Sequence, residues 1–213
     1  MMRSITSNKN KREKILAILF WLVLWQLASF WIGQELLLVP PGRVAWTLLQ
    51  LVREADFWAT VSYSLLRIVG GFLLAIVAGI VLAVFSAASS LARALLSPFF
   101  GVVKSVPVAS FIILVLIWAG SGSLSVVISF LMVLPFIYTN VLDGILHTDP
   151  KLLEMAGVFR ISMIRRARAI YMPQTMPYFR AACKVGLGMC WKSGIAAEVI
   201  GLPTGSIGER LSR

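Results

Sequence analysis

The stretch IVGGFLLAIVAGIVLAVFSAASSLA, residues 68–92, decides the class of fold. It contains no ionisable side chain and is bounded by Arg67 and Arg93. Crossing the roughly 30 Å hydrocarbon core of a bilayer takes about 20 helical residues, so this stretch is long enough to span it. We expect a transmembrane helix here, because backbone polar groups in lipid must form hydrogen bonds within their own segment.

The composition of the whole chain agrees with a membrane protein. Of its 213 residues, 59% are hydrophobic and 14% are charged, and the mean hydropathy is +0.87. Soluble domains have roughly 45–50% apolar and about 25% charged residues. The 20 Lys and Arg residues against 9 Asp and Glu give a net charge of +11. These basic residues cluster between apolar runs, which disfavours nucleic acid as a partner.

The other apolar runs predict four further crossings. Residues 15–33 carry no charge, and the run 105–142 is too long for one span. Gly-Ser-Gly-Ser at 120–123 is a turn composition that divides this run into two spans. Residues 181–200 are apolar with helical spacing, although they contain Lys184, Lys192 and Glu198. The predicted fold is therefore all-α, a polytopic bundle of five membrane helices.

The distribution of Lys and Arg predicts the orientation of this bundle. The tail 1–14 carries five such residues, and residues 151–168 carry another five. Loops on the cytoplasmic side are enriched in Lys and Arg. We therefore place the tail and the segment 143–175 in the cytoplasm, and assign residues 15–213 to the membrane domain. Five crossings then leave the C-terminus outside.

Small residues recur every four positions along two of the predicted spans. They are Gly71, Ala75, Gly79, Ala83 and Ala87 on the second span, and Ala182, Gly186, Cys190 and Gly194 on the fifth. This spacing lets another helix approach closely in lipid. Packing within the chain is favoured over a dimer face. Cys183 and Cys190 are interpreted as packing residues rather than as ligands.

Three residues are candidates for lining a translocation pathway: Lys104, Pro107 and Lys192. Pro98 and Pro107 flank Lys104 and predict a bent or interrupted helix. Broken helices mark the pathways of many transporters, and a simple kink is an equal alternative. Lys192 lies near the middle of its span, where a cation is costly. It either lines the pathway or pairs with a carboxylate on another helix.

Three other charged residues have simpler interpretations. Arg67 and Lys184 lie near the ends of their spans, where long side chains can reach the interface by snorkelling. Glu198 follows Lys192 by six residues, so it lies on a different helical face and is not an obvious partner for that lysine.

Neither catalytic residues nor a metal site is expected. His147 is the only histidine, so zinc chemistry and a His-based triad lack partners. Lys192-Ser193 resembles the end of a phosphate-binding loop, but Trp191 replaces the glycine that such a loop requires. We therefore expect no enzyme activity, no cofactor and no ATP binding by that route.

A short helix is predicted in the segment between the last two spans. Asp149 is a suitable N-cap, and Pro150 suits the first helical position. In a helix that runs to about Ile164, one apolar face is formed by Leu152, Leu153, Ala156 and Phe159. Such a helix in a basic loop lies on lipid or docks into a protein groove. Composition alone does not choose between the two.

The same segment resembles the cytoplasmic signature of inner-membrane permease subunits of bacterial ATP-binding-cassette importers. That signature reads E-A-A, three residues, G, nine residues, I, one residue, L-P. In register, this chain has Glu154, Met155, Ala156, Arg160, Ile170, Met172 and Pro173. Arg160 replaces a glycine that permits a sharp turn in the family, and Gly157 is an alternative source of flexibility.

Further segments extend the resemblance to the nitrate, sulfonate and taurine branch, from residue 36 to the end. They are PP at 40–41, SLLRIVGGF at 64–72, SVP at 105–107, IWAG at 117–120, WKSG at 191–194 and AE at 197–198. The resemblance implies a permease subunit of the bacterial inner membrane that forms the pathway for a small solute. It also implies an external binding protein, cytoplasmic ATPase subunits that hydrolyse the ATP, and a second permease subunit, expected as a homodimer. The implied solute is a sulfonate-, nitrate- or taurine-like anion or a pyrimidine-type vitamin precursor.

In this family the signature helix enters a groove on the ATPase and moves as a rigid lever. The resemblance assigns this coupling contact to Glu154, Met155, Ala156, Gly157, Arg160, Ile170 and Pro173, with Glu154 as the polar anchor. Family members usually have six spans, so a final span is expected to be missing here. The alternative function is a membrane scaffold subunit without a transport role, which would have no ATPase partner.

Overall fold

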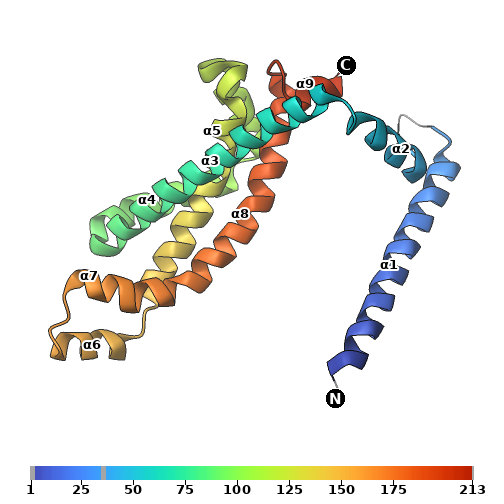
Figure 1. Ribbon diagram of the computed structural model, residues 1–213. Helices are drawn as coiled ribbons and strands as arrows, with labels where there is room; N and C mark the ends of the chain where they lie inside the picture. The colour runs from blue at the N-terminus through green and yellow to red at the C-terminus, as the bar shows by residue number, and fades with distance from the viewer. Residues whose placement is uncertain (1–2, 35–36, 213) are drawn as a thin grey trace. The chain divides into compact units, whose positions relative to one another are not determined.

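The computed structural model describes residues 3–34 and 37–212, and within these ranges the side chains from Arg12 to Leu211 (Figure 1). The side chains of Arg3, Lys9 and Lys11 in the predicted basic tail lie outside the described residues. The described residues form helices joined by turns and contain no strand, which confirms the all-α prediction. The chain divides into two compact units, Met1–Trp58 and Ala59–Arg213.

The first unit contains two helices, α1 (Arg3–Ile32) and α2 (Pro41–Leu51). α1 runs without a break from the predicted tail through the predicted first span. Pro41 occupies the first turn of α2, where its missing N–H costs no hydrogen bond. The hydroxyl of Ser29 donates to the Leu38 carbonyl at 2.8 Å, which ties the end of α1 to the turn that follows.

Three long helices organise the second unit: α3 (Ala55–Ala88), which enters it from the first unit, α5 (Val108–Leu146) and α8 (Met172–Gly201). The shorter helices are α4 (Ser90–Ser105), α6 (Pro150–Val158), α7 (Met163–Arg166), the π-helix η1 (Ala167–Tyr171) and α9 (Ile207–Ser212). Figure 1 shows α5 and α8 side by side, with α6 and α7 at one end of the pair and α9 at the other.

Among the described residues, three helical stretches are long and apolar enough to cross a membrane: Arg12–Ile32, α3 and α5. The predicted third and fourth spans both fall within α5. Its backbone leaves the helical region at Gly120 (φ 69°, ψ 174°), where the Gly-Ser turn was predicted. The arm 108–119 is only about 18 Å long, so a crossing there would have to include residues of α4. α8 contains the predicted fifth span but is not among the three, and the count of five stays a prediction.

The predicted interruption next to Lys104 is present between α4 and α5. α4 ends at Ser105, and both Val106 (ψ 132°) and Pro107 (ψ 136°) have extended backbones. Pro107 has no N–H to continue the helical ladder, which explains why the helix restarts only after it. Pro98 lies inside α4. The prediction allowed either a bend or an interruption, and the structure has an interruption at Pro107.

Small residues allow the three long helices to pack closely. A Cβ atom on Gly79 of α3 would lie 2.7 Å from Cγ2 of Ile137 on α5. A Cβ atom on Gly194 of α8 would lie 2.7 Å from Cγ1 of Ile68 on α3. Cys190 is 2% exposed within the same core. The predicted packing of small residues within the chain is therefore confirmed.

Candidate functional site

The segment with the signature-like residues forms a helical corner, residues 149–166, at one end of the second unit (Figure 1). α6 begins as predicted. The carboxylate of Asp149 accepts a hydrogen bond from the backbone N–H of Lys151 at 2.9 Å, and Pro150 occupies the first turn. α6 ends at Val158, however, so the expectation that it runs to about Ile164 is wrong.

The backbone of Arg160 explains why α6 ends early. Its φ of 49° lies in the left-handed region, which costs a residue with a side chain roughly 1–2 kcal/mol. The resembled signature has a glycine at this position, and this chain makes the turn there without one. Gly157 lies inside α6, so it is not the source of the turn.

Arg166 of α7 holds the corner together. Its Nε donates to the carbonyl of Ile161 at 2.8 Å, and its Nη2 donates to the carbonyl of Ala156 at 3.1 Å. The N–H of Ile161 donates to the same Ala156 carbonyl at 2.9 Å. Ala156 is fully buried, whereas the other described side chains of α6 are partly or largely exposed. The inner side of α6 is therefore fixed to α7 through Ala156.

The outer side of the corner is apolar. Val158 and Phe159 are 79% and 72% exposed, and Ile164 of α7 is 82% exposed. Together with two exposed methionines they form what we call the corner patch: Met155, Val158, Phe159, Met163 and Ile164. Glu154 is exposed on the same helix. Exposed apolar patches with polar neighbours are typical of interaction sites.

The predicted apolar face of α6 is divided between these two sides. Leu152 and Leu153 are half-buried and Ala156 is buried, so they face the chain itself. Phe159 is exposed and belongs to the corner patch. The sequence pattern therefore indicates the side of α6 that packs inward. Of the corner patch, the predicted apolar face included only Phe159.

The corner continues into α8 without a break, because α7, η1 and α8 follow one another directly. Ile170 in η1 is buried at this junction. Pro173 lies in the first turn of α8 and lacks the N–H of a regular helix. The wider π-helical turn of η1 precedes it, as is common where a helix adjusts to an irregular residue. α7, η1 and α8 therefore form one continuous helical stretch over residues 163–201.

The predicted pathway candidates have different surroundings. Nζ of Lys104 donates to Oγ1 of Thr139 at 2.9 Å and lies 5.3 Å from the ring centre of Phe136, so this lysine links α4 to α5. Pro107 is exposed at the interruption that precedes α5. Lys192 is exposed on α8.

Sequence reasoning missed a buried polar network near α9, at the other end of the second unit. Glu198 of α8 is fully buried, and its Oε2 accepts a hydrogen bond from Oγ of Ser64 at 2.6 Å. Oγ of Ser64 in turn accepts a hydrogen bond from the N–H of Ile207 at 3.0 Å. This network joins α3, α8 and α9. Nothing in the local pattern indicates it, because Ser64 and Glu198 lie 134 residues apart.

Arg67 lies beside this network and does not snorkel as predicted. Its Nε donates to Oγ of Ser125 at 3.1 Å, and its Nη1 donates to the hydroxyl of Tyr63. Its Nη2 and the Oε1 of Glu198 are both buried without a hydrogen-bond partner. Charged groups with unused bonding positions inside a membrane bundle are costly and tend to be functional.

Metal ligands do not gather in the described part of the chain, which holds no group of three or more His, Cys, Asp or Glu side chains suited to a metal ion.

Residues 71–213 match the family model described as the binding-protein-dependent transport system inner membrane component. The match covers more than half of the chain and includes the helical corner. The chain belongs to this family. It is thus a permease-type component of a membrane transport system, as the signature-like residues predicted.

Individual relatives of this permease are named for several solutes. A putative aliphatic sulfonates transport permease of Escherichia coli is 30% identical over 186 residues, which are 85% of this chain and 70% of that protein. The taurine transport system permease of the same organism is 26% identical over 86% of this chain and 69% of its own length. A nitrate import permease of Leptolyngbya laminosa is 28% identical over 71% of this chain and 53% of its own length. The chain therefore spans between about half and 70% of the length of these relatives.

Proposed function

We propose that this permease forms part of the translocation pathway of an ATP-driven importer, for a small anion delivered by an external binding protein. The family description supports transport that depends on a binding protein. Relatives named for aliphatic sulfonates, taurine and nitrate support a small oxyanion as the solute. A second copy of the chain completes the pathway in this proposal.

The observation that carries the proposal is the corner patch next to Glu154. α6 presents apolar side chains and a carboxylate outward, while the Ala156–Arg166 contact fixes its inner side to α7. A short helix with an apolar outer face can enter a groove on a partner protein. The partner is a cytoplasmic ATPase subunit, which hydrolyses ATP and moves α6 together with α8. The permease itself is not an enzyme.

The orientation in this proposal places the N-terminus and the helical corner in the cytoplasm of a bacterium, below its inner membrane. Lys151, Arg165 and Arg168 are exposed around the corner and support a cytoplasmic location. In the second unit α9 lies at the end opposite to α6, which supports an external location for α9 (Figure 1).

Replacing Glu154 with Arg tests the proposal. We expect the Glu154→Arg permease to lose ATPase co-purification and ATP-dependent uptake, because the polar anchor of the contact reverses its charge. Glu13→Arg makes the same substitution on an exposed residue of α1 and should leave both properties unchanged. Normal ATPase binding and uptake by Glu154→Arg would contradict the assigned contact. A scaffold subunit would purify without any ATPase even as the wild-type chain.

A further inference from the structure

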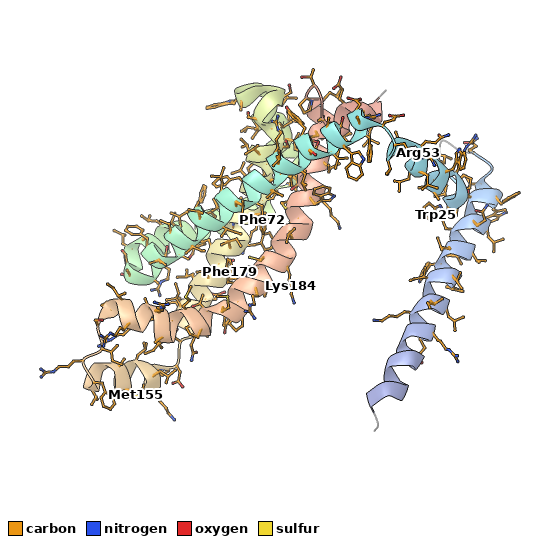
Figure 2. All side chains as sticks on the ribbon, in the orientation of Figure 1. Trp25, Arg53, Phe72, Met155, Phe179 and Lys184 are labelled. Carbon is orange, nitrogen blue, oxygen red and sulfur yellow. The ribbon has the colours of Figure 1, made fainter. Side chains whose placement is uncertain are left out.

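α8 carries three cations on one exposed face. Arg180, Lys184 and Lys192 are all exposed. At 3.6 residues per turn they lie within about 120° of the helix circumference and over about 18 Å of its axis. We call this the basic face of α8, defined by Arg180, Lys184, Gly188 and Lys192. Figure 2 shows Lys184 projecting from α8 away from α5, on the side opposite to Phe179.

The positive charge of the basic face is not neutralised by α8 itself. Glu198 is the one carboxylate of this 30-residue helix, and it is buried against Ser64 of α3, six residues beyond Lys192. Within the described residues, no hydrogen bond or ion pair joins the side chains of Arg180, Lys184 or Lys192 to another group. The opposite face of α8 packs into the core through its small residues, Ala182, Gly186, Cys190 and Gly194.

Lipid cannot cover the basic face at low cost. α8 packs along α5, which is long and apolar enough to cross a membrane, so the two helices share the same depth. A Lys or Arg near the bilayer centre costs about 2.5–3.5 kcal/mol on insertion scales. Lys192 lies about 12 Å along the axis from Lys184 and about 13 Å from the end of α8 at Gly201. Lys184 can snorkel toward the nearer interface, but a lysine side chain is shorter than the distance from Lys192 to the end of α8, so Lys192 stays at membrane depth.

We propose that the basic face of α8 lines a water-filled passage and selects small anions for transport. This inference rests on the proposed function as a permease. It goes further by naming one helix face that lines the passage and the sign of the charge that this face selects. Exposed positive charges along a narrow passage raise the local concentration of anions and repel cations. A singly charged oxyanion would pass Lys192, Lys184 and Arg180 in turn. The opposite wall comes from the second permease copy.

A cysteine at Gly188 measures the charge of this passage directly, because Gly188 lies between Lys184 and Lys192 and an added Cβ meets open space. Gly188→Cys is placed in a chain with Cys183→Ala and Cys190→Ala, assembled with its ATPase in membranes. The introduced thiol is modified with a negatively charged (sulfonatoethyl) or a positively charged (trimethylammonioethyl) methanethiosulfonate. Each rate is divided by that reagent's rate with a free thiol. We expect the negative reagent to react at least about 10-fold faster after this correction.

Neutralising the lysines should remove this preference. In the double variant Lys184→Met, Lys192→Met the ratio of the two corrected rates should approach one. The double variant Lys184→Arg, Lys192→Arg keeps both charges and should keep the preference for the negative reagent. Arg53→Met with Lys151→Met removes the same charge from exposed positions outside α8 and should leave the ratio unchanged. The proposal would be overturned by equal corrected rates or by no reaction with either reagent. It would also be overturned if the ratio of the rates stayed the same when both lysines were replaced by methionine. A wild-type chain that binds no ATPase and transports nothing would instead contradict the proposed function.

Discussion

Replacing Arg166 with Ala should release α6 from the rest of the helical corner. Arg166 closes the corner through hydrogen bonds of 2.8 Å to the Ile161 carbonyl and 3.1 Å to the Ala156 carbonyl. A hydrogen bond from a charged donor contributes about 1.5–3 kcal/mol. Because Arg166 is only half-buried, solvent screening reduces the two together to about 2 kcal/mol. At about 1.4 kcal/mol per tenfold change, the open form of the corner becomes roughly 30-fold more populated.

Hydrogen exchange followed by mass spectrometry measures this opening. The N–H of Ile161 donates to the Ala156 carbonyl at 2.9 Å and is protected only while the corner is closed. Arg166→Ala should speed its exchange roughly 30-fold, and amides in the core of α5 should keep their protection. Arg165→Ala removes an exposed neighbouring cation and is the matched control. Unchanged exchange at Ile161 in Arg166→Ala, or an equal increase in both variants, would refute the bracing role of Arg166.

Three further substitutions test the conformation and packing through the thermal stability of the purified permease. Arg160→Gly should stabilise the chain by about 0.5–1 kcal/mol, because glycine adopts the φ of 49° without strain; a lower melting temperature would argue against a strained turn. Ser64→Ala should cost about 1–3 kcal/mol, since it leaves the Glu198 carboxylate without its hydroxyl donor, whereas Ser62→Ala on the exposed side of α3 should be neutral. Gly194→Ala should cost about 1–3 kcal/mol, because its Cβ would lie 2.7 Å from a side-chain atom of α3. The Cβ of Gly188→Ala would meet open space, so this variant should keep its stability. An equal loss of stability in both glycine variants would show that close packing is not the cause.

Features set by neighbouring residues could be predicted from the sequence. Asp149 and Pro150 define the start of α6 through one side-chain hydrogen bond and one fixed φ angle. Gly120 allows the positive φ that breaks α5, and Pro107 removes the N–H that would join α4 to α5. Each of these effects acts within about one helical turn, so the local sequence is sufficient.

Features that depend on distant contacts could not be predicted in the same way. Arg67 was expected to snorkel, but Ser125 of another helix accepts its hydrogen bond. Glu198 was given no partner from the sequence, and in the structure it is buried and bonded to Ser64 of α3. An arginine does not by itself favour the left-handed backbone of Arg160, and only its place at the glycine of the resembled signature indicated a turn there. Tertiary packing decides the surroundings of Arg67 and Glu198.

The central claim is that the corner patch docks onto an ATPase, and a crosslink from Val158 tests it most directly. Val158 is 79% exposed on α6. Val158→Cys in a Cys183→Ala, Cys190→Ala background should crosslink to a co-purified ATPase subunit through a short thiol-reactive linker. Val77→Cys, on the exposed side of α3, should give no such product. A complex that imports its solute yet gives no crosslink from Val158→Cys would contradict the account.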